Sequence, residues 1–183
     1  SSFVNFDIIQ SQTGAFDYKA NYENKLFDVK LFSQNSLSYL FQDRFYSNHY
    51  NWENTDLKNT QIVGLKTFIK PIKKVKIGAT YQVISNYMFF DANMNVIQES
   101  KAISMFSPEV YFSLDKNHLG FNTHILYHLF SRNSVLGLPN FNSVSKLYYK
   151  ASLFKKALRA NIGVEVRTFS DFYSYNYMPT TQV

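Results

Sequence analysis

Three histidines that follow one another closely, His118, His124 and His128, are of a residue type that can coordinate a metal ion. On an extended chain His124 and His128 share a face but lie about 13 Å apart, since each residue advances the chain by roughly 3.3 Å. Two ligands at that separation cannot hold one zinc ion. A helix would bring them together, but the apolar alternation around them favours a strand. We therefore expect isolated histidines, with no metal site and no cofactor.

The carboxylates show no recognisable catalytic pairing. The acids considered are Asp43, Glu53, Asp56, Glu99, Glu109 and Glu165. The sequence also lacks a Gly-rich phosphate loop, a Gly-x-Ser-x-Gly elbow and a His-Glu-x-x-His pair. It contains no cysteine, which excludes a disulfide scaffold and a thiolate metal site. We therefore expect a protein that is not an enzyme.

A second set of polar residues shares one phase of the expected strands. Its members are Lys76, Gln82, Lys146, Lys150, Arg159, Glu165 and Arg167. In a barrel these side chains would face the lumen, where they could set a preference for anions. The simpler alternative, which we favour, is that mixed charges hydrate and brace the interior.

Aromatic residues make up 18% of the chain and gather near the expected strand ends. The candidates for a membrane-interface girdle are Tyr46, Tyr50, Trp52, Tyr87, Phe89, Phe172 and Tyr173, accompanied by Phe45, Phe90, Tyr175 and Tyr177. Girdles of this kind lie at the two membrane–water boundaries. The alternative interpretations are packing within loops or a surface on which carbohydrate stacks.

The elements that would position these residues are two-faced strands. In residues 157–170 the apolar Leu158, Ile162, Val164 and Val166 alternate with charged residues such as Arg159 and Arg167. Only an extended chain separates the two kinds completely, because successive side chains point to opposite sides. We expect the apolar set to face lipid. Similar alternation recurs in residues 16–22, 27–31, 75–83, 103–114, 119–129 and 144–153.

These segments predict about eight to ten strands in one all-β domain covering residues 1–183. No run approaches the roughly 20 apolar residues of a membrane-spanning helix, and the mean hydropathy is -0.25. An antiparallel up-and-down transmembrane β-barrel, or a segment of a larger one, fits both observations. The expected connections are short near residues 23, 72, 116 and 155, and longer at 47–56, 91–95 and 131–143. If neighbouring strands are antiparallel, the short connections lie at one end of the sheet and the longer ones at the other.

The net charge of +6 is spread along the chain. The densest cluster, Lys70, Lys73, Lys74 and Lys76, contains Pro71, so a turn with solvated lysines is favoured over a phosphate-binding patch. We expect no nucleic-acid partner.

Three segments resemble the β-barrel porin family of Bacteroidetes outer membranes. They are FQDRFYSNHYNWEN at 41–54, IGATYQVISNYMFFD at 77–91 and LYYKASLFKKALRANIGVEVRTFSDFYSYNYMP at 147–179. The resemblance, which covers residues 37–179, implies a bacterial outer-membrane location and a pore. Because members of that family are longer, it also implies an internal portion of a barrel. On that basis we expect the strands near 16–22 and 158–170 to pair with chain outside this sequence.

The function that follows is a porin-like channel or a structural barrel subunit of an outer-membrane complex. Its expected partners are outer-membrane lipid and other outer-membrane proteins. The main alternative is a soluble all-β glycan-binding module with exposed tyrosines. A barrel-borne enzyme is a third class, and the missing catalytic constellation counts against it.

Overall fold

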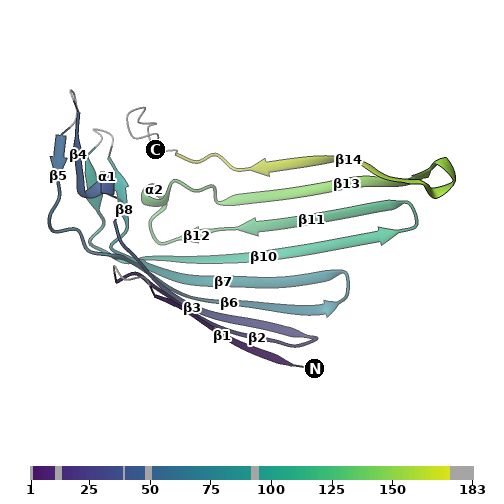
Figure 1. Ribbon diagram of the computed structural model, residues 1–183, viewed down its shortest axis with the longest axis horizontal. Helices are drawn as coiled ribbons and strands as arrows, with labels where there is room; N and C mark the ends of the chain where they lie inside the picture. The colour runs from purple at the N-terminus through teal and green to yellow at the C-terminus, as the bar shows by residue number, and fades with distance from the viewer. Residues whose placement is uncertain (1, 11–13, 39, 48–50, 92–94, 174–183) are drawn as a thin grey trace.

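The structure, a computed structural model, describes residues 2–10, 14–38, 40–47, 51–91 and 95–173. Nearly all of its regular structure is β-strand (Figure 1). The strands are β1 (Phe3–Gln10), β2 (Phe16–Glu23), β3 (Phe27–Ser36), β4 (Arg44–Tyr46), β5 (Asn51–Glu53), β6 (Thr60–Ile72), β7 (Val75–Ser85), β8 (Met88–Phe90), β9 (Val96–Gln98), β10 (Ile103–Lys116), β11 (Leu119–Tyr127), β12 (Leu129–Phe130), β13 (Phe141–Leu153) and β14 (Leu158–Phe169). The helical pieces are α1 (Leu40–Asp43), α2 (Asn133–Leu136) and the 3-10 turn η1 (Phe154–Lys156).

The ten-stranded main sheet is an antiparallel meander in the order β1-β2-β3-β6-β7-β10-β11-β13-β14. The short β12 lies beside β10 and continues β11 after the break at His128. Each strand therefore pairs with its neighbours in sequence, apart from short hairpins inserted in the long connections. The prediction of an all-β, antiparallel up-and-down sheet is confirmed, whereas the described residues do not form a closed barrel.

The connections divide between the two ends of the sheet as predicted. The turns β2–β3, β6–β7, β10–β11 and β13–β14 lie together at one end, called here the turn end (Figure 1). The longer connections, with α1, α2 and the small hairpins, lie at the other end, called the loop end. In the first of the tight turns the Asn24 Oδ1 accepts hydrogen bonds from the backbone N–H groups of Leu26 and Phe27, both at 2.7 Å. Such an Asx turn reverses the chain without a glycine.

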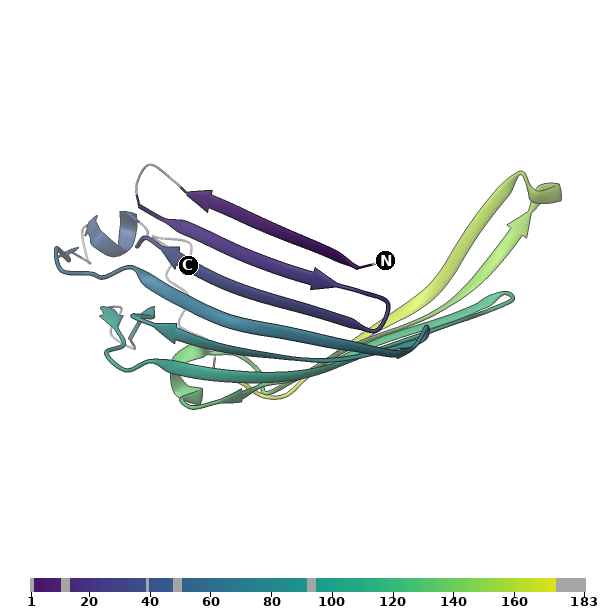
Figure 2. The same cartoon turned by 90° about the horizontal axis from the view of Figure 1, so that it is seen from below.

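The sheet is bent into a trough, and the β13–β14 hairpin projects beyond the other turns (Figure 2). Glycines on one face relieve crowding where aromatic rings cross the neighbouring strand. A Cβ at Gly78 would lie 2.2 Å from the Phe68 ring, and one at Gly120 would lie 2.1 Å from the Tyr148 ring. Glycine in a strand typically marks such a close approach. The same face therefore accommodates large rings while the sheet curves.

The two edges of the sheet, β1 and β14, do not pair with each other among the described residues. The prediction that the strand near residues 16–22 pairs with chain outside this sequence is wrong, because β2 pairs with β1 on one side and with β3 on the other. Within the segment FVNFDIIQ, apolar and polar residues alternate from Val4 to Ile8, so it forms a strand for the same reason as the others. Among the described residues β14 pairs only with β13, so the expectation that residues 158–170 pair with chain outside this sequence stays a prediction.

Two of the predicted loops contain regular structure. Within 47–56, strand β5 pairs with β4 in a small hairpin, and Phe45 lies directly opposite Trp52. Within 131–143, the helix α2 precedes β13, which begins at Phe141. Both hairpin and helix are too short for a periodic pattern to predict. The described helices are also too short to cross a membrane.

Few side chains are buried, and most of those that are lie at the loop end. Ile84, Ile103, Val135 and Leu136 form one cluster, surrounded by Ile62, Tyr87, Phe89 and Phe130. Ile103 is fully buried. This small core fixes α2 and the β8–β9 hairpin to the main sheet.

Candidate functional site

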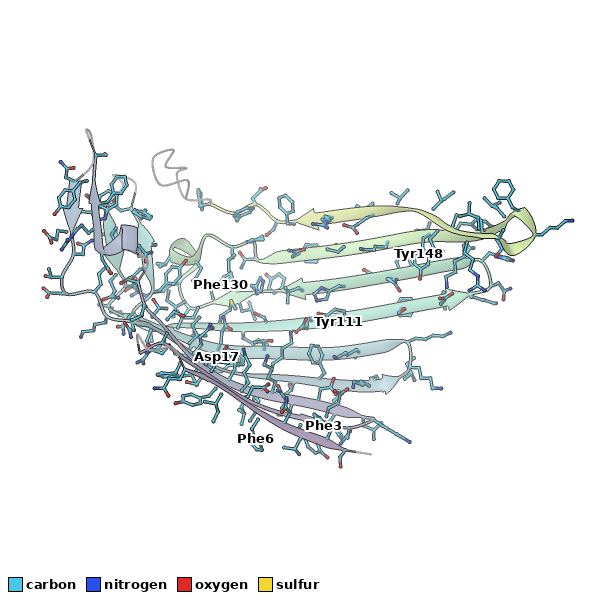
Figure 3. The ribbon with its side chains drawn as sticks, viewed as in Figure 1. Phe3, Phe6, Asp17, Tyr111, Phe130 and Tyr148 are labelled. Atoms are coloured by element: carbon cyan, nitrogen blue, oxygen red, sulfur yellow. The ribbon has the colours of Figure 1, made fainter. Side chains whose placement is uncertain are left out.

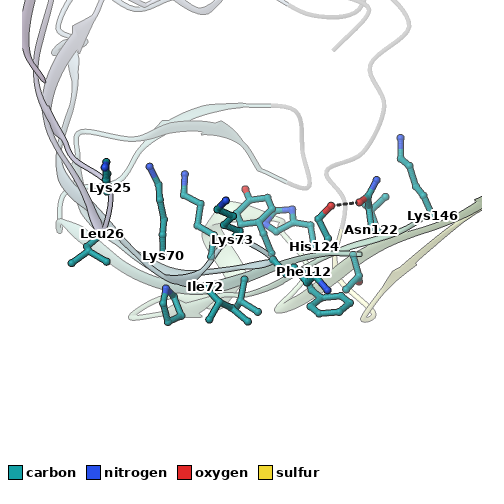
Figure 4. Close-up of a pocket in the computed structure, with 17 residues that line it drawn as sticks. Lys25, Leu26, Lys70, Ile72, Lys73, Phe112, Asn122, His124 and Lys146 are labelled. Carbon is teal, nitrogen blue, oxygen red and sulfur yellow. Dashed lines mark hydrogen bonds between the residues drawn. The ribbon is translucent and has the colours of Figure 1, made fainter. Parts of the chain in front are cut away.

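The strand register places the chain's polar residues in rows across one face of the sheet. One row runs from Lys76 through Tyr111, His124 and Val144 to Arg167, each directly opposite the next. In an antiparallel sheet, residues that lie opposite each other point to the same side. Figure 4 shows His124 and Lys146 on the concave side, with Ile72 and Phe112 on the other. This row therefore lies on the concave face.

All seven polar residues that the alternation grouped together lie on this concave face by strand register. They are Lys76, Gln82, Lys146, Lys150, Arg159, Glu165 and Arg167. Their shared face is a finding, whereas their exposure to a water-filled lumen stays a prediction.

Glu109 is the centre of a polar cluster in the middle of the concave face. It is only 4% exposed. Its Oε1 pairs with the Lys66 Nζ at 2.7 Å. Its Oε2 accepts a hydrogen bond from the Tyr111 hydroxyl at 2.9 Å and lies 3.1 Å from the His124 Nε2. Three partners, Lys66 on β6, Tyr111 on β10 itself and His124 on β11, thus compensate one nearly buried carboxylate.

Aromatic rings and lysines extend this cluster toward the turn end. The rings of Tyr111 and His124 stack in parallel, with centroids 3.9 Å apart. The Lys76 Nζ lies 3.9 Å from the centroid of the Phe68 ring, and the Lys66 Nζ lies 4.9 Å from it. Ammonium groups at such distances are attracted to the ring face. The rings therefore hold lysines in place beside the carboxylate.

Ion pairs cross the strands at the turn end as well. Lys70 lies 2.6 Å from Asp28 and 2.8 Å from Glu23, and Lys76 lies 3.1 Å from Asp28. On the far strands, Glu165 pairs with Lys146 and Arg167, both at 2.6 Å. Lys150 also pairs with Asp115.

An open hollow of about 900 Å³ occupies this turn end (Figure 4). Its lining combines six lysines with His124, Tyr111 and Asn122, and it also includes the apolar residues Leu26, Pro71, Ile72, Val75 and Phe112. No carboxylate belongs to the lining.

The loop end of the concave face is covered instead of open. Ile62, Ile84 and Ile103 are on the concave phase of their strands, and α2 packs over them through Val135 and Leu136. Two polar contacts fasten this cover: Arg132 Nη1 lies 2.8 Å from Glu99 Oε2, and Gln98 Nε2 donates to the Lys58 carbonyl at 2.6 Å. A hydrogen bond from the Lys101 backbone N–H, together with Arg132, lowers the pKa of Glu99 below its ordinary value.

The aromatic residues proposed for an interface girdle belong mostly to this loop end. Trp52 stacks on Phe45 at 4.8 Å and meets the edge of Phe90 at 5.9 Å. Tyr87 and Phe89 stack at 6.3 Å and pack against the small core. Packing within the loops, one of the alternatives considered, thus engages these three candidates, while their contact with a membrane interface stays a prediction.

Of the remaining girdle candidates, Tyr46 ends β4, and Phe172 and Tyr173 are the last residues that the structure describes. The Tyr46 hydroxyl donates to Glu53 Oε2 at 2.9 Å, which raises the pKa of Tyr46. Phe172 meets Phe169 edge-on, and Tyr173 is fully exposed at 90%. Tyr50 lies outside the described residues.

The convex face is apolar and exposed. The alternate residues of β14, Ile162 and Val164, are 69% and 67% exposed, and Phe6 on β1 is 72% exposed. Figure 3 labels Phe6 on this edge strand. Along the central strands Leu65, Tyr81 and Ile125 occupy the same phase. Large contiguous apolar surfaces of this kind mark contact with another apolar phase, either a partner protein or a membrane.

The histidines occupy separate positions in the concave wall. His118 Nδ1 lies 3.1 Å from the Lys150 carbonyl, His124 joins the Glu109 cluster, and His128 Nδ1 lies 2.8 Å from the Ser107 hydroxyl. Within the part of the chain that the structure describes, no three His, Asp or Glu side chains form a group able to hold a metal ion.

The Glu109 cluster is the part of the site that sequence reasoning missed. Glu109 was considered only as a possible catalytic acid, and Lys66 was not singled out. Both lie on the polar phase of their strands, which was the available signal. Their contact depends on the register across β6, β7 and β10, and no local pattern contains that information.

The fold and its two faces define a class: an antiparallel β-meander with one charged, concave face and one apolar, convex face. The chain matches the protein family described as "Putative porin" over residues 2–183. It therefore belongs to that family. No curated protein and no solved structure matches the chain significantly.

Proposed function

We propose that this sheet is part of the wall of a β-barrel in a bacterial outer membrane, and that the barrel conducts small hydrophilic solutes along the concave face. The observation that carries the proposal is the chemical opposition of the two faces. Transmembrane barrels alternate apolar residues toward lipid with polar residues toward the interior. Crossing a bilayer takes about 9–11 residues in a tilted strand, and β7 has 11 residues and β13 has 13.

Closure of the wall requires strands beyond the nine that run from β1 to β14. An unpaired edge exposes backbone N–H and C=O groups, which a bilayer does not tolerate. In the proposed barrel, β1 and β14 therefore pair with further strands, supplied by the same protein or by another chain. The proposal assigns no catalysis to the concave face, because its carboxylates and histidines are engaged in ion pairs and hydrogen bonds with neighbouring strands.

Paired cysteine substitutions test which face meets water and which meets lipid. Residues 1–183 contain no cysteine, so Tyr81→Cys and Gln82→Cys each introduce the single thiol of this part of the wall, on adjacent residues of β7. Any cysteine elsewhere in the full-length protein is first replaced by serine. In vesicles containing the full-length protein, Gln82→Cys should react with a charged, membrane-impermeant thiol reagent. Tyr81→Cys should react only with a lipid-soluble reagent.

Equal labelling of both thiols by the charged reagent would contradict the membrane location and favour a soluble module. A conductance measurement in planar bilayers then separates the two outer-membrane roles. Ion conductance supports a channel, whereas correct labelling without conductance leaves a structural subunit of an outer-membrane complex.

A further inference from the structure

The hollow at the turn end has an unusual charge distribution. Lys25, Lys70, Lys73, Lys74, Lys76 and Lys146 line it, and no carboxylate does. Figure 4 shows Lys25, Lys70, Lys73 and Lys146 rising on the concave side. Three strands, β6, β7 and β13, and the two turns β2–β3 and β6–β7 thus place lysines around one space.

Only half of these lysines are neutralised by nearby acids. Lys70 and Lys76 share Asp28, and Lys146 pairs with Glu165. By contrast, Lys25, Lys73 and Lys74 have no carboxylate partner among the described residues. A ligand anion can pair with such an ammonium group without first displacing a carboxylate of the protein.

The connections at the two ends of the sheet also differ in net charge. The four short connections between the main strands at the turn end contain Lys25, Lys73, Lys74, Lys155 and Lys156 and no acid. The long connections at the loop end contain the acids Asp43, Glu53, Asp56, Asp91 and Glu99 against the cations Arg44, Lys58, Lys101 and Arg132. The positive field is therefore concentrated at the turn end.

From this arrangement we infer that the hollow is an anion-binding vestibule for small multivalent anions that carry phosphate or carboxylate groups. The inference rests on the proposed channel and names the class of solute that the channel takes. Uncompensated cations along a low-dielectric wall raise the local concentration of anions. The ligand is a dissolved anion and not a lipid headgroup, since the labelled lysines stand on the concave side, away from the apolar convex face.

Ion selectivity of the full-length protein in bilayers of neutral lipid provides the first test. Under a KCl gradient the reversal potential should indicate that chloride is preferred over potassium. The double substitution K73Q/K74Q should lower that preference by about twofold or more. The matched control K58Q/K101Q removes two lysines from the loop end and should leave the preference unchanged.

Salt provides a second control on the same measurement. Raising the ionic strength from 0.1 M to 1 M shortens the Debye length from about 10 Å to about 3 Å. The difference between wild type and K73Q/K74Q should therefore shrink at high salt. An equal loss of preference in K58Q/K101Q would overturn the vestibule, because it would show that total charge alone sets selectivity.

Inorganic phosphate binding to the detergent-solubilised protein tests the vestibule without requiring a pore. Phosphorus NMR should show line broadening of phosphate by wild type and by K58Q/K101Q, and several-fold weaker broadening by K73Q/K74Q. Phosphate binding without conductance would overturn the channel and keep the vestibule. Conductance with selectivity and phosphate binding unaffected by K73Q/K74Q would overturn the vestibule and keep the channel. If K73Q/K74Q instead weakens only the association with phosphatidylglycerol vesicles, the lysines serve lipid headgroups and the inference is wrong.

Discussion

The two halves of the concave face are built from the same strands but are filled differently. At the loop end, α2 and the β8–β9 hairpin cover the sheet with apolar side chains around Ile103. At the turn end the same strands carry lysines around an open hollow. Glu109 lies between the two halves, on the strand that joins them. The difference shows that one sheet can be covered at one end and open at the other, through the side chains of its strands together with the segments that connect them.

The comparison also separates two sources of stability. The loop end is held by burial, which requires close packing, whereas the turn end is held by cross-strand ion pairs and by rings that lie over glycines. In the proposed channel, the packed loop end is therefore expected to be the narrower part. The turn end is the wider and more strongly charged part.

The largest effect is expected from removing the centre of the loop-end core. Ile103→Ala should lower the free energy of unfolding by about 2–5 kcal/mol, because it leaves a cavity among residues that cannot collapse fully. Urea unfolding of the protein refolded into lipid vesicles measures this loss. The control Ile77→Ala removes the same atoms from the convex face, where the side chain is 40% exposed, and should cost much less. Equal costs at both positions would remove the distinction between a packed loop end and an exposed face.

A somewhat smaller effect is expected at the boundary between the halves. Glu109→Gln removes the charge that pairs with Lys66 and leaves that ammonium group without its partner. The expected cost is about 1.5–3 kcal/mol, the range for hydrogen bonds to charged groups, in the same urea titration. Glu23→Gln is the matched control, since Glu23 also pairs with a lysine but its side chain is 63% exposed. A loss at Glu23 as large as that at Glu109 would show that burial of the carboxylate is not what matters.

Replacing the glycines that lie under aromatic rings by alanine should lower the stability by different amounts at different positions. In Gly78→Ala the new Cβ would lie 2.6 Å from the Thr67 carbonyl oxygen as well as against the Phe68 ring, so the backbone must shift. Overpacking of this kind costs about 1–3 kcal/mol. In Gly120→Ala the close atoms belong to the far end of the Tyr148 ring, which can swing aside. Thermal unfolding should therefore rank Gly120→Ala as the milder change, and the reverse order would contradict the packing described here.

The smallest effect on stability is expected from a change of pH, which acts on Glu99 at the loop end. The folded state lowers the pKa of Glu99 through the Lys101 N–H and Arg132, so the contact stabilises fully above the ordinary carboxyl pKa. This contribution is lost as the pH falls through the lowered value. Fluorescence of Trp52, the single tryptophan, should report a slight loosening of the loop end in acid. Glu99→Gln should remove the part of the acid response that belongs to this contact, and an unchanged response in that variant would exclude Glu99 as its source.

Much of the architecture could be predicted from the sequence because strand side chains alternate with a period of two. That period assigned Leu158, Ile162, Val164 and Val166 to one face and Arg159, Glu165 and Arg167 to the other, and the register confirms the separation. The spacing of turn residues likewise predicted which connections gather at each end. These features depend on neighbours in the sequence, so local patterns contain them.

The tertiary structure decided which residues meet across strands. Lys66 is on β6 and Glu109 is on β10, with β7 between them in the sheet. Likewise, Ile62, Ile84, Ile103 and Val135 come from four different elements. Their contacts depend on the register of several strand pairs in succession, and each register is set by turn geometry and by packing on the shared face. The pairing of β2 with β1 was missed for a related reason, since a strand's alternation identifies its faces but not its partner. Local chemistry thus determined the two faces of this protein, whereas register, together with the packing of its turns and loops, brought together its charge cluster, its small core and its basic hollow.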